Sequence, residues 1–201
     1  MARPRQISDE QILATMKELV LQHGPSVSLD VVAEKLGVTS PALLKRFGSR
    51  KTLLVQALRP PARPEWMNAL EKGPDGRSLV VQLEEVFSSI FGYFRQVLPC
   101  LTALRESGIS VDAVFDKNEP QPLRGIRSLK AWLLSAQKAK LIETDAPESI
   151  ATAMVGALQA KIFVAHLMQQ PISLRSQQQY VRDLALLFAR GLQPQGASKN
   201  T

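Results

Sequence analysis

Apolar residues recur three or four positions apart along nearly every segment of this 201-residue chain. That spacing places them on one face of an α-helix, whereas a half-buried strand alternates apolar and polar residues. Alternating runs bounded by turn residues are missing. With 45% hydrophobic residues, the chain has enough apolar side chains for a sizeable core. The sequence therefore predicts an all-α protein.

Capping residues and helix breakers set the boundaries of the first helices. Ser8 and Gln11 have the spacing of a capping box, and Gly24-Pro25 is typical of a helix end. Hydroxyl residues that precede the later segments are the preferred helix N-caps. We expect helices over residues 9–23, 29–36, 40–47 and about 49–58, with Ser28 and Thr39 as the caps of the second and third.

Three prolines, Pro60, Pro61 and Pro64, interrupt the helical pattern. A continuous helix could not cross them without a large cost in free energy. We therefore expect a three-helix helix-turn-helix domain with its flanking helix at residues 1–60. A larger helical domain at 61–192 and a frayed tail at 193–201 would follow.

The second domain shows the same helical periodicity, interrupted by turn residues. Pro99 and Gly108 should bracket a short piece after the long helix, and Asp145 with Glu148 resembles a second capping box. We expect helices over residues 65–72, 78–98, 123–139, 146–168 and 174–192, with a loop at 116–122.

Charge and cysteine content limit the classes of function. The net charge of +7 and pI near 9.8 favour an anionic partner, either nucleic acid or an anionic membrane surface, and charge alone does not choose between them. The polar N-terminus lacks the apolar core of a signal peptide. We also expect no apolar run of the roughly 20 residues that are needed to span a bilayer. The sequence therefore predicts a cytoplasmic protein without a membrane partner. A single cysteine, Cys100, with two distant histidines argues against a metal site, and no cofactor is expected.

The segment from Ser28 to Leu54 carries the functional signal. Two short helices joined by a turn at Gly37 form the helix-turn-helix pattern, whose second helix enters the major groove of DNA. Val38, Leu43 and Phe47 would anchor that helix to the core. The basic residues after it have no acid between them and suit neighbouring phosphates: Lys45, Arg46, Arg50 and Lys51.

This segment resembles the tetracycline-repressor (TetR) family of transcriptional regulators. The family pattern has an apolar-Ala pair, Gly-Val-Ser/Thr, a short recognition helix, Phe, a Ser-Lys-like pair and Leu. The matching residues lie within about 50 N-terminal residues and are Val32-Ala33, Gly37-Val38-Thr39, Phe47, Ser49-Arg50 and Leu53.

The resemblance implies a set of DNA contacts. Phosphate contacts fall on Ser28, Thr39, Arg46 and Arg50, with Lys51 beside them, and groove contacts fall on Ser40, Pro41, Ala42 and Lys45. Two positions depart from the family: Leu44 replaces a tyrosine that touches the DNA backbone, and Arg50 replaces a lysine. Leucine has no hydrogen-bond donor, so that contact is either absent or made by another residue such as Arg46.

The last two helices are apolar over wide arcs and must be covered on more than one side. Helices of this kind suit a four-helix interface with a second copy of the chain. Two recognition helices must also reach successive major grooves, so the resemblance and the geometry both imply a homodimer on a double-stranded DNA operator.

The resemblance further implies a small apolar or amphipathic effector in the second domain. Candidate pocket residues are large apolar side chains with one polar member: Phe87, Phe91, Phe94, Trp132, Met154 and His166. Effector binding would shift the helix that joins the two domains and lower DNA affinity, as in a repressor.

No constellation of catalytic residues is present, so we do not expect an enzyme: the sequence lacks a glycine-rich phosphate loop, a G-x-S-x-G motif and metal-spaced histidines. The alternative is a helical protein-interaction module whose helix-turn-helix no longer binds DNA, for which Leu44 is the one hint. Steep salt dependence of DNA binding would separate the two.

Overall fold

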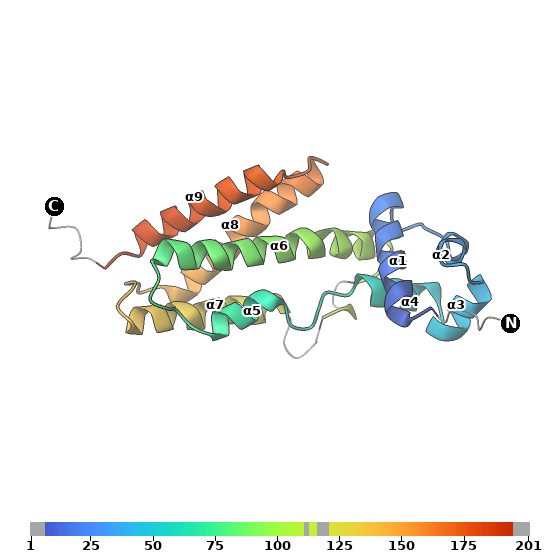
Figure 1. The fold of residues 1–201 in the computed structure, drawn as a ribbon, viewed down its shortest axis with the longest axis horizontal. Helices are drawn as coiled ribbons and strands as arrows, with labels where there is room; N and C mark the ends of the chain where they lie inside the picture. The colour runs from blue at the N-terminus through green and yellow to red at the C-terminus, as the bar shows by residue number, and fades with distance from the viewer. Residues whose placement is uncertain (1–6, 111–112, 116–120, 195–201) are drawn as a thin grey trace. The chain divides into compact units, whose positions relative to one another are not determined.

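The computed structural model describes residues 7–110, 113–115 and 121–194, and the regular elements in these ranges are all α-helices (Figure 1). The all-α prediction is confirmed. The helices are α1 (Asp9–His23), α2 (Leu29–Leu36), α3 (Ser40–Phe47), α4 (Arg50–Leu58), α5 (Glu65–Glu71), α6 (Leu79–Glu106), α7 (Gln121–Lys138), α8 (Pro147–Leu167) and α9 (Leu174–Gly191).

The chain divides into two compact units. Unit 1 comprises Met1–Pro60 and Val97–Lys117, and unit 2 comprises Pro61–Gln96 and Asn118–Thr201. The break after Pro60 coincides with the first proline of the expected junction. The segment 97–117, expected in the second domain, belongs instead to unit 1, because its apolar side chains are buried with those of the N-terminal helices.

Side-chain caps fix the helices of unit 1. The Ser8 hydroxyl accepts a hydrogen bond from the Gln11 amide at 3.2 Å, and the Gln11 side chain accepts one from the Ser8 amide at 2.9 Å, which completes the predicted capping box. Ser28, Thr39 and Ser49 likewise cap α2, α3 and α4. These helix starts are local properties of the sequence.

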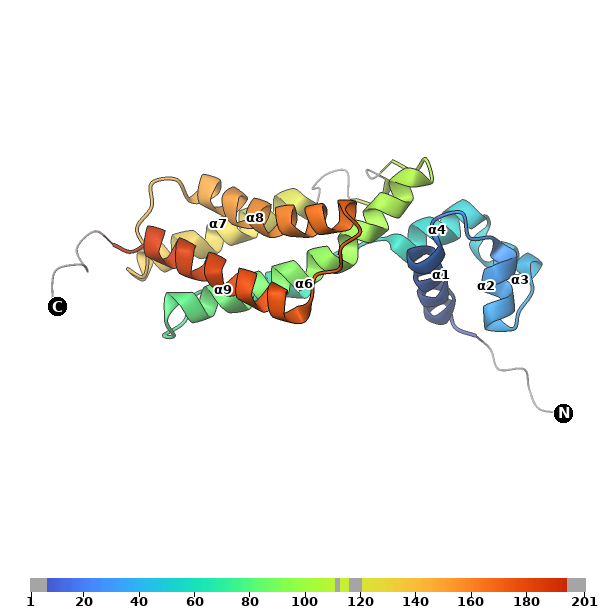
Figure 2. The same ribbon diagram turned by 90° about the horizontal axis from the view of Figure 1, so that it is seen from above.

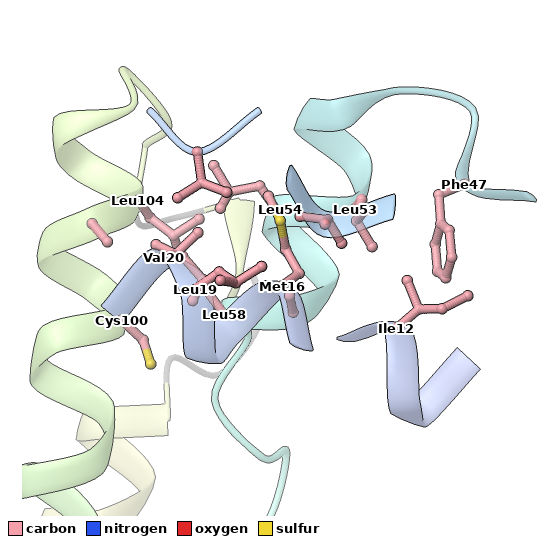
Figure 3. Close-up of a cluster of buried hydrophobic side chains, with 14 of the residues drawn as sticks. Ile12, Met16, Leu19, Val20, Phe47, Leu53, Leu54, Leu58, Cys100 and Leu104 are labelled. Carbon is pink, nitrogen blue, oxygen red and sulfur yellow. The ribbon is translucent and has the colours of Figure 1, made fainter. Parts of the chain in front are cut away.

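The core of unit 1 joins α1, α4 and the end of α6, as Figure 3 shows. Met16, Leu54 and Leu104 are fully buried in it, and Cys100 lies in the same cluster. Burial raises the pKa of the Cys100 thiol, so this cysteine behaves as a small apolar core residue. Apolar burial of this kind is the main force that holds segment 97–117 to the N-terminal helices.

Pro99 lies inside α6, which differs from the expected break at this residue. A proline removes one helical hydrogen bond and crowds the preceding turn. Residues on both sides of Pro99, Val97 and Cys100, are buried, and their burial keeps the helix continuous. The Thr102 hydroxyl also donates to the Leu98 carbonyl oxygen at 3.1 Å. Tertiary burial therefore outweighs the local preference for a break.

Unit 2 is a helical bundle built from α5, the first part of α6, α7, α8 and α9. Figure 2 shows α7 beside α8 and α9 beside α6, and α5 also contacts α7. Phe87 of α6 meets Phe188 of α9 edge to face with ring centroids 5.9 Å apart, and Phe91 meets Tyr180 at 6.3 Å. Such aromatic pairs add directional contacts to the apolar core.

The start of α8 differs from the expected capping box. Ala146 is the N-cap residue and provides no side-chain cap, so Asp145 does not play that role. Glu148 forms an ion pair with Lys130 of α7 at 2.8 Å, which lowers the pKa of the Glu148 carboxyl. The Glu148 carboxylate, which the predicted capping box would have used, therefore pairs with Lys130 instead.

The ends of two expected segments fall outside the described residues. Most of the predicted loop at 116–122, namely residues 116–120, lies outside the described residues. Helix α7 begins at Gln121. Of the expected tail, the structure describes only Gln193 and Pro194.

Helix α8 corrects the expectation that no segment is apolar enough to span a membrane. By length and composition, it is the one helix in the described ranges that qualifies, because small and aliphatic apolar residues make up most of it. One face of α8 packs inside unit 2 through Met154, Leu158 and Ile162. Its opposite side carries exposed apolar residues, so the composition suits a helix that is covered on two sides.

Candidate nucleic-acid interface

The turn between α2 and α3 has the geometry of a helix-turn-helix. Gly37 adopts a left-handed conformation, φ 67° and ψ 32°, which glycine reaches without steric penalty. The Val38 amide then donates to the Ala33 carbonyl oxygen at 3.0 Å, closing the end of α2. Leu43 and Phe47 of α3 are buried, so that helix is fixed to the core by one face.

The opposite face of α3 is open. Pro41, Ala42 and Lys45 are exposed, as the sequence predicts for residues near the groove, and Leu44 is 41% exposed. An exposed leucine thus occupies the position where the TetR family has a tyrosine. Contact through this face would depend on apolar surface and shape more than on hydrogen bonds.

The predicted hydroxyl contacts, Ser28 and Thr39, act as helix caps. Their oxygens accept hydrogen bonds from the amides of Val31 at 3.3 Å and Ala42 at 3.4 Å. A hydroxyl has one donor besides its acceptor positions. Each cap can therefore still donate its proton to a phosphate oxygen.

Ser40, the first residue of α3, points to α2. Its hydroxyl donates to the Oδ1 atom of Asp30, which lies in the first turn of α2. Asp30 is exposed and Ser40 half-buried. The sequence interpretation singled out Ser40 but missed Asp30. The sequence signal that could have identified Asp30 is an acidic residue in the first turn of the helix before α3.

Arg46 is held by the start of α1. Its Nη1 atom donates to the Ile7 carbonyl oxygen at 2.6 Å, and its Nε atom pairs with the Asp9 carboxylate. Both partners are distant in the sequence, Ile7 by 39 residues. The guanidinium therefore ties α3 to α1.

Arg50 is a second internal anchor. Its Nε atom donates to the Val27 carbonyl oxygen at 2.8 Å, and its Nη2 atom donates to the Pro25 carbonyl oxygen. The side chain is partly buried. It joins the first turn of α4 to the segment that leads into α2.

Lys45 and Lys51 are the freely presented members of the basic cluster. Both are exposed, and among the described residues neither takes part in an ion pair or hydrogen bond. Lys35 instead pairs with Glu18 at 2.8 Å, which lowers the pKa of the Glu18 carboxyl. Lys45 and Lys51 thus have ammonium groups that are available to an anion.

The predicted effector residues divide by burial. Phe87, Phe91, Trp132 and Met154 are buried in unit 2. Phe94 is half-buried and meets Tyr93 with ring centroids 5.3 Å apart. His166 is exposed near the end of α8 and is not part of this buried group.

The sequence interpretation passed over Trp66, which is 4% exposed and packs against Gly125. It also meets Tyr93 edge to face at 6.2 Å. Burial raises the pKa of Tyr93 to about 12. Within the described ranges, no three His, Cys, Asp or Glu side chains gather in a way that could hold a metal ion.

Neither a protein-family model nor a curated protein matches the sequence. Solved structures do match over nearly the whole chain. A TetR family transcriptional regulator from Thermus thermophilus is 20% identical with a TM-score of 0.65, covering 92% of this chain and 100% of its own.

Two further structures agree. A TetR-like transcriptional regulator from Rhodococcus is 22% identical with a TM-score of 0.60, covering 94% of this chain and all of its own. A TetR transcriptional regulator from Streptomyces coelicolor is 21% identical with a TM-score of 0.55, covering 93% and 99%. The chain therefore has the fold of the TetR-family transcriptional regulators.

Proposed function

We propose that this protein is a DNA-binding transcriptional regulator that acts as a homodimer. The observation that carries the proposal is the helix-turn-helix of unit 1. Its second helix is anchored by Leu43 and Phe47 and exposes Pro41, Ala42 and Lys45 on the other face. The TetR-like fold of the whole chain supports the same function.

We assign the DNA contacts according to whether each side chain is exposed and has hydrogen-bond donors that no internal acceptor uses. Lys45 and Lys51 would contact phosphates directly, with the hydroxyls of Ser28 and Thr39 as further donors. Ser40, Pro41 and Ala42 would face the base edges. Arg46 and Arg50 would act mainly by positioning α3 and α4, since two nitrogens of each guanidinium already bond to internal acceptors.

A homodimer is supported by the surface of the last two helices. Six large apolar side chains of α8, α9 and the turn between them are each more than half exposed. Exposed apolar surface of this kind marks a protein contact. The residues are Phe163, Val164, Leu167, Met168, Leu174 and Leu187.

The effector proposal rests on the aromatic interior of unit 2. Phe87, Phe91, Trp132 and Met154 would line a site for a small apolar or amphipathic molecule. Binding there would favour a conformation with lower operator affinity, which makes the protein a repressor that its effector releases. The repressor role follows the prevailing behaviour of the family.

Leu44 favours a second candidate, a helical protein-interaction module without DNA binding. The Leu44 side chain is exposed and apolar, at a position where the resemblance implies a hydrogen-bond donor to a DNA phosphate. Such a module would bind duplex DNA only weakly and without preference for sequence.

Affinity for duplex DNA from the region flanking the protein's own gene, measured across a salt series beside a random duplex, tests the proposal. The test variant is Lys45→Ala/Lys51→Ala. The control is Lys72→Ala/Lys138→Ala, which removes the same charge from exposed positions in unit 2.

We expect tight binding by the wild type at two chains per site. The magnitude of the slope of log affinity against log salt should fall by about 0.9 for each phosphate that the variant no longer contacts. The control should keep the wild-type slope. Equally weakened binding in both double variants, or no preference over random duplex in a genome-wide fragment selection, would favour the interaction module.

A further inference from the structure

Asp30 and Ser40 form a polar pair that joins the two helices of the helix-turn-helix. The Ser40 hydroxyl donates its proton to the Asp30 carboxylate, and the two residues lie at the first turns of α3 and α2. Thr39 already caps α3. The Ser40 side chain is therefore not needed as a cap and is free for this interaction.

The hydrogen-bonding capacity of this pair is one-sided. A serine hydroxyl has a single proton, and here that proton faces Asp30. An ionised carboxylate can only accept hydrogen bonds. Toward any third group, Asp30 and Ser40 together offer acceptors and no donor.

The bases of DNA differ in what they can give to such a surface. In the major groove, guanine shows two acceptors and thymine shows an acceptor and a methyl group, whereas cytosine shows an amino donor. Adenine shows an amino donor beside an acceptor. An acceptor-only pair is thus satisfied best by cytosine, next by adenine, and opposed by guanine and thymine.

Charge gives a second reason for a base contact. Asp30 is exposed, and in the part of the chain that the structure describes it forms no ion pair with a basic side chain. Close to phosphates, an unneutralised carboxylate weakens binding through like-charge repulsion. Donation from a base amino group offsets that repulsion only on the preferred sequence.

We propose that Asp30, with Ser40 held against it, selects cytosine at one position in each half of the operator. The inference rests on the proposed DNA binding and adds a specificity determinant to it. Asp30 makes the contact with the base amino group, and Ser40 fixes the carboxylate and adds a second acceptor.

Selection of bound sequences from a duplex library with randomised half-sites tests the inference. The proteins compared are the wild type, Asp30→Asn, Ser40→Ala and the control Glu34→Gln. The control removes the same charge from an exposed position of the same helix. Circular dichroism verifies that each variant is folded.

We expect one position where the wild type prefers cytosine, with adenine second. In Asp30→Asn, the preference for cytosine there should fall about tenfold, because the amide adds a donor that guanine or thymine accepts. Ser40→Ala should weaken the same preference, and Glu34→Gln should keep it. Preferences at other positions should be unchanged in all variants.

Two outcomes overturn the inference in distinguishable ways. If the wild type enriches no sequence and shows no salt-dependent binding, the proposed function itself fails. If it enriches a defined operator, but Asp30→Asn and Ser40→Ala select the same bases as Glu34→Gln, the regulator remains and the role of Asp30 in specificity is wrong.

Discussion

The guanidinium of Arg50 donates to the Val27 carbonyl oxygen at 2.8 Å, which fastens the start of α4 to the segment before α2. Pro25 supplies a second carbonyl acceptor for the same side chain. A planar guanidinium can serve two acceptors at once in a fixed geometry. Arg50 therefore fixes the position of α4 relative to the segment before α2.

Arg50→Ala should lower the free energy of unfolding. Hydrogen bonds from charged groups contribute about 1.5–3 kcal/mol each, and partial exposure places the expected destabilisation near the lower value. Lys51→Ala, an exposed neighbour, should change stability by less than about 0.5 kcal/mol. Urea denaturation measures both. Equal stability of the two variants would contradict an anchoring role for Arg50.

The helix-capping residues could be predicted from the sequence, whereas the anchoring contacts of Arg46 and Arg50 could not. Ser8, Ser28 and Thr39 bond to amides three residues ahead, so their roles follow from local spacing. The partners of Arg46 and Arg50 lie 39 and 23 residues away. No local pattern predicts those contacts, so the charge of the two arginines and the family resemblance both pointed to phosphate contacts instead.

Tertiary contacts also explain two differences between the predicted and the observed helices. Pro99 predicts a break, but buried neighbours on both sides keep α6 continuous. Asp145 and Glu148 have capping-box spacing, but Glu148 pairs with Lys130 of another helix. At Pro99, burial outweighs a local cost of about 3 kcal/mol. At Glu148, the carboxylate pairs with another helix and takes no part in a capping box.

Gly125→Ala should destabilise unit 2. A Cβ atom at this position would lie 2.5 Å from Cη2 and 3.0 Å from Cζ2 of the buried Trp66 ring. Overpacking of this kind lowers the free energy of unfolding by about 1–3 kcal/mol. Thermal and urea denaturation report the change.

Gly92→Ala is the matched control for this prediction. Gly92 also lies within a helix, but apart from its chain neighbours and the backbone of its own helix, no atom lies within 4 Å of an added Cβ. Its substitution should raise helix propensity, by up to about 1 kcal/mol. A Gly125→Ala protein as stable as Gly92→Ala would refute the close contact with Trp66.

Phe163→Asp/Leu167→Asp should convert the proposed dimer into a monomer. The two side chains are 54% and 66% exposed on the same side of α8. Burying such a side chain contributes about 1.5–3 kcal/mol, so the dissociation constant should rise more than about tenfold. Sedimentation velocity gives the mass. Leu21→Asp, at an exposed leucine of α1, should remain dimeric.

Spectrophotometric titration should detect two protected tyrosines. Burial raises the pKa of Tyr93 to about 12 and the pKa of Tyr180 above its ordinary value, and these are the chain's two tyrosines. A raised pKa favours the protonated folded form, so this contribution to stability is complete below about pH 10. It disappears as the pH rises from there through about 12.

Tyrosinate absorption of the native protein should therefore develop at higher pH than in denaturant. Tyr180→Phe leaves Tyr93 as the only tyrosine, so its titration isolates the larger shift. A native single-tyrosine protein that titrates with the unfolded value of about 10 would contradict the burial of Tyr93.

Leu44→Tyr should increase operator affinity, because it adds a hydroxyl donor at an exposed position of α3. A net hydrogen bond contributes about 0.5–1.5 kcal/mol, which corresponds to roughly two- to tenfold in affinity for each contact. Leu44→Phe supplies the ring without the donor and should bind like the wild type. Fluorescence anisotropy with labelled operator measures both, and the gain should shrink as salt rises. Because the phosphate contact needs the hydroxyl alone, equal affinity of the two variants would place residue 44 away from the DNA backbone and strengthen the interaction-module alternative.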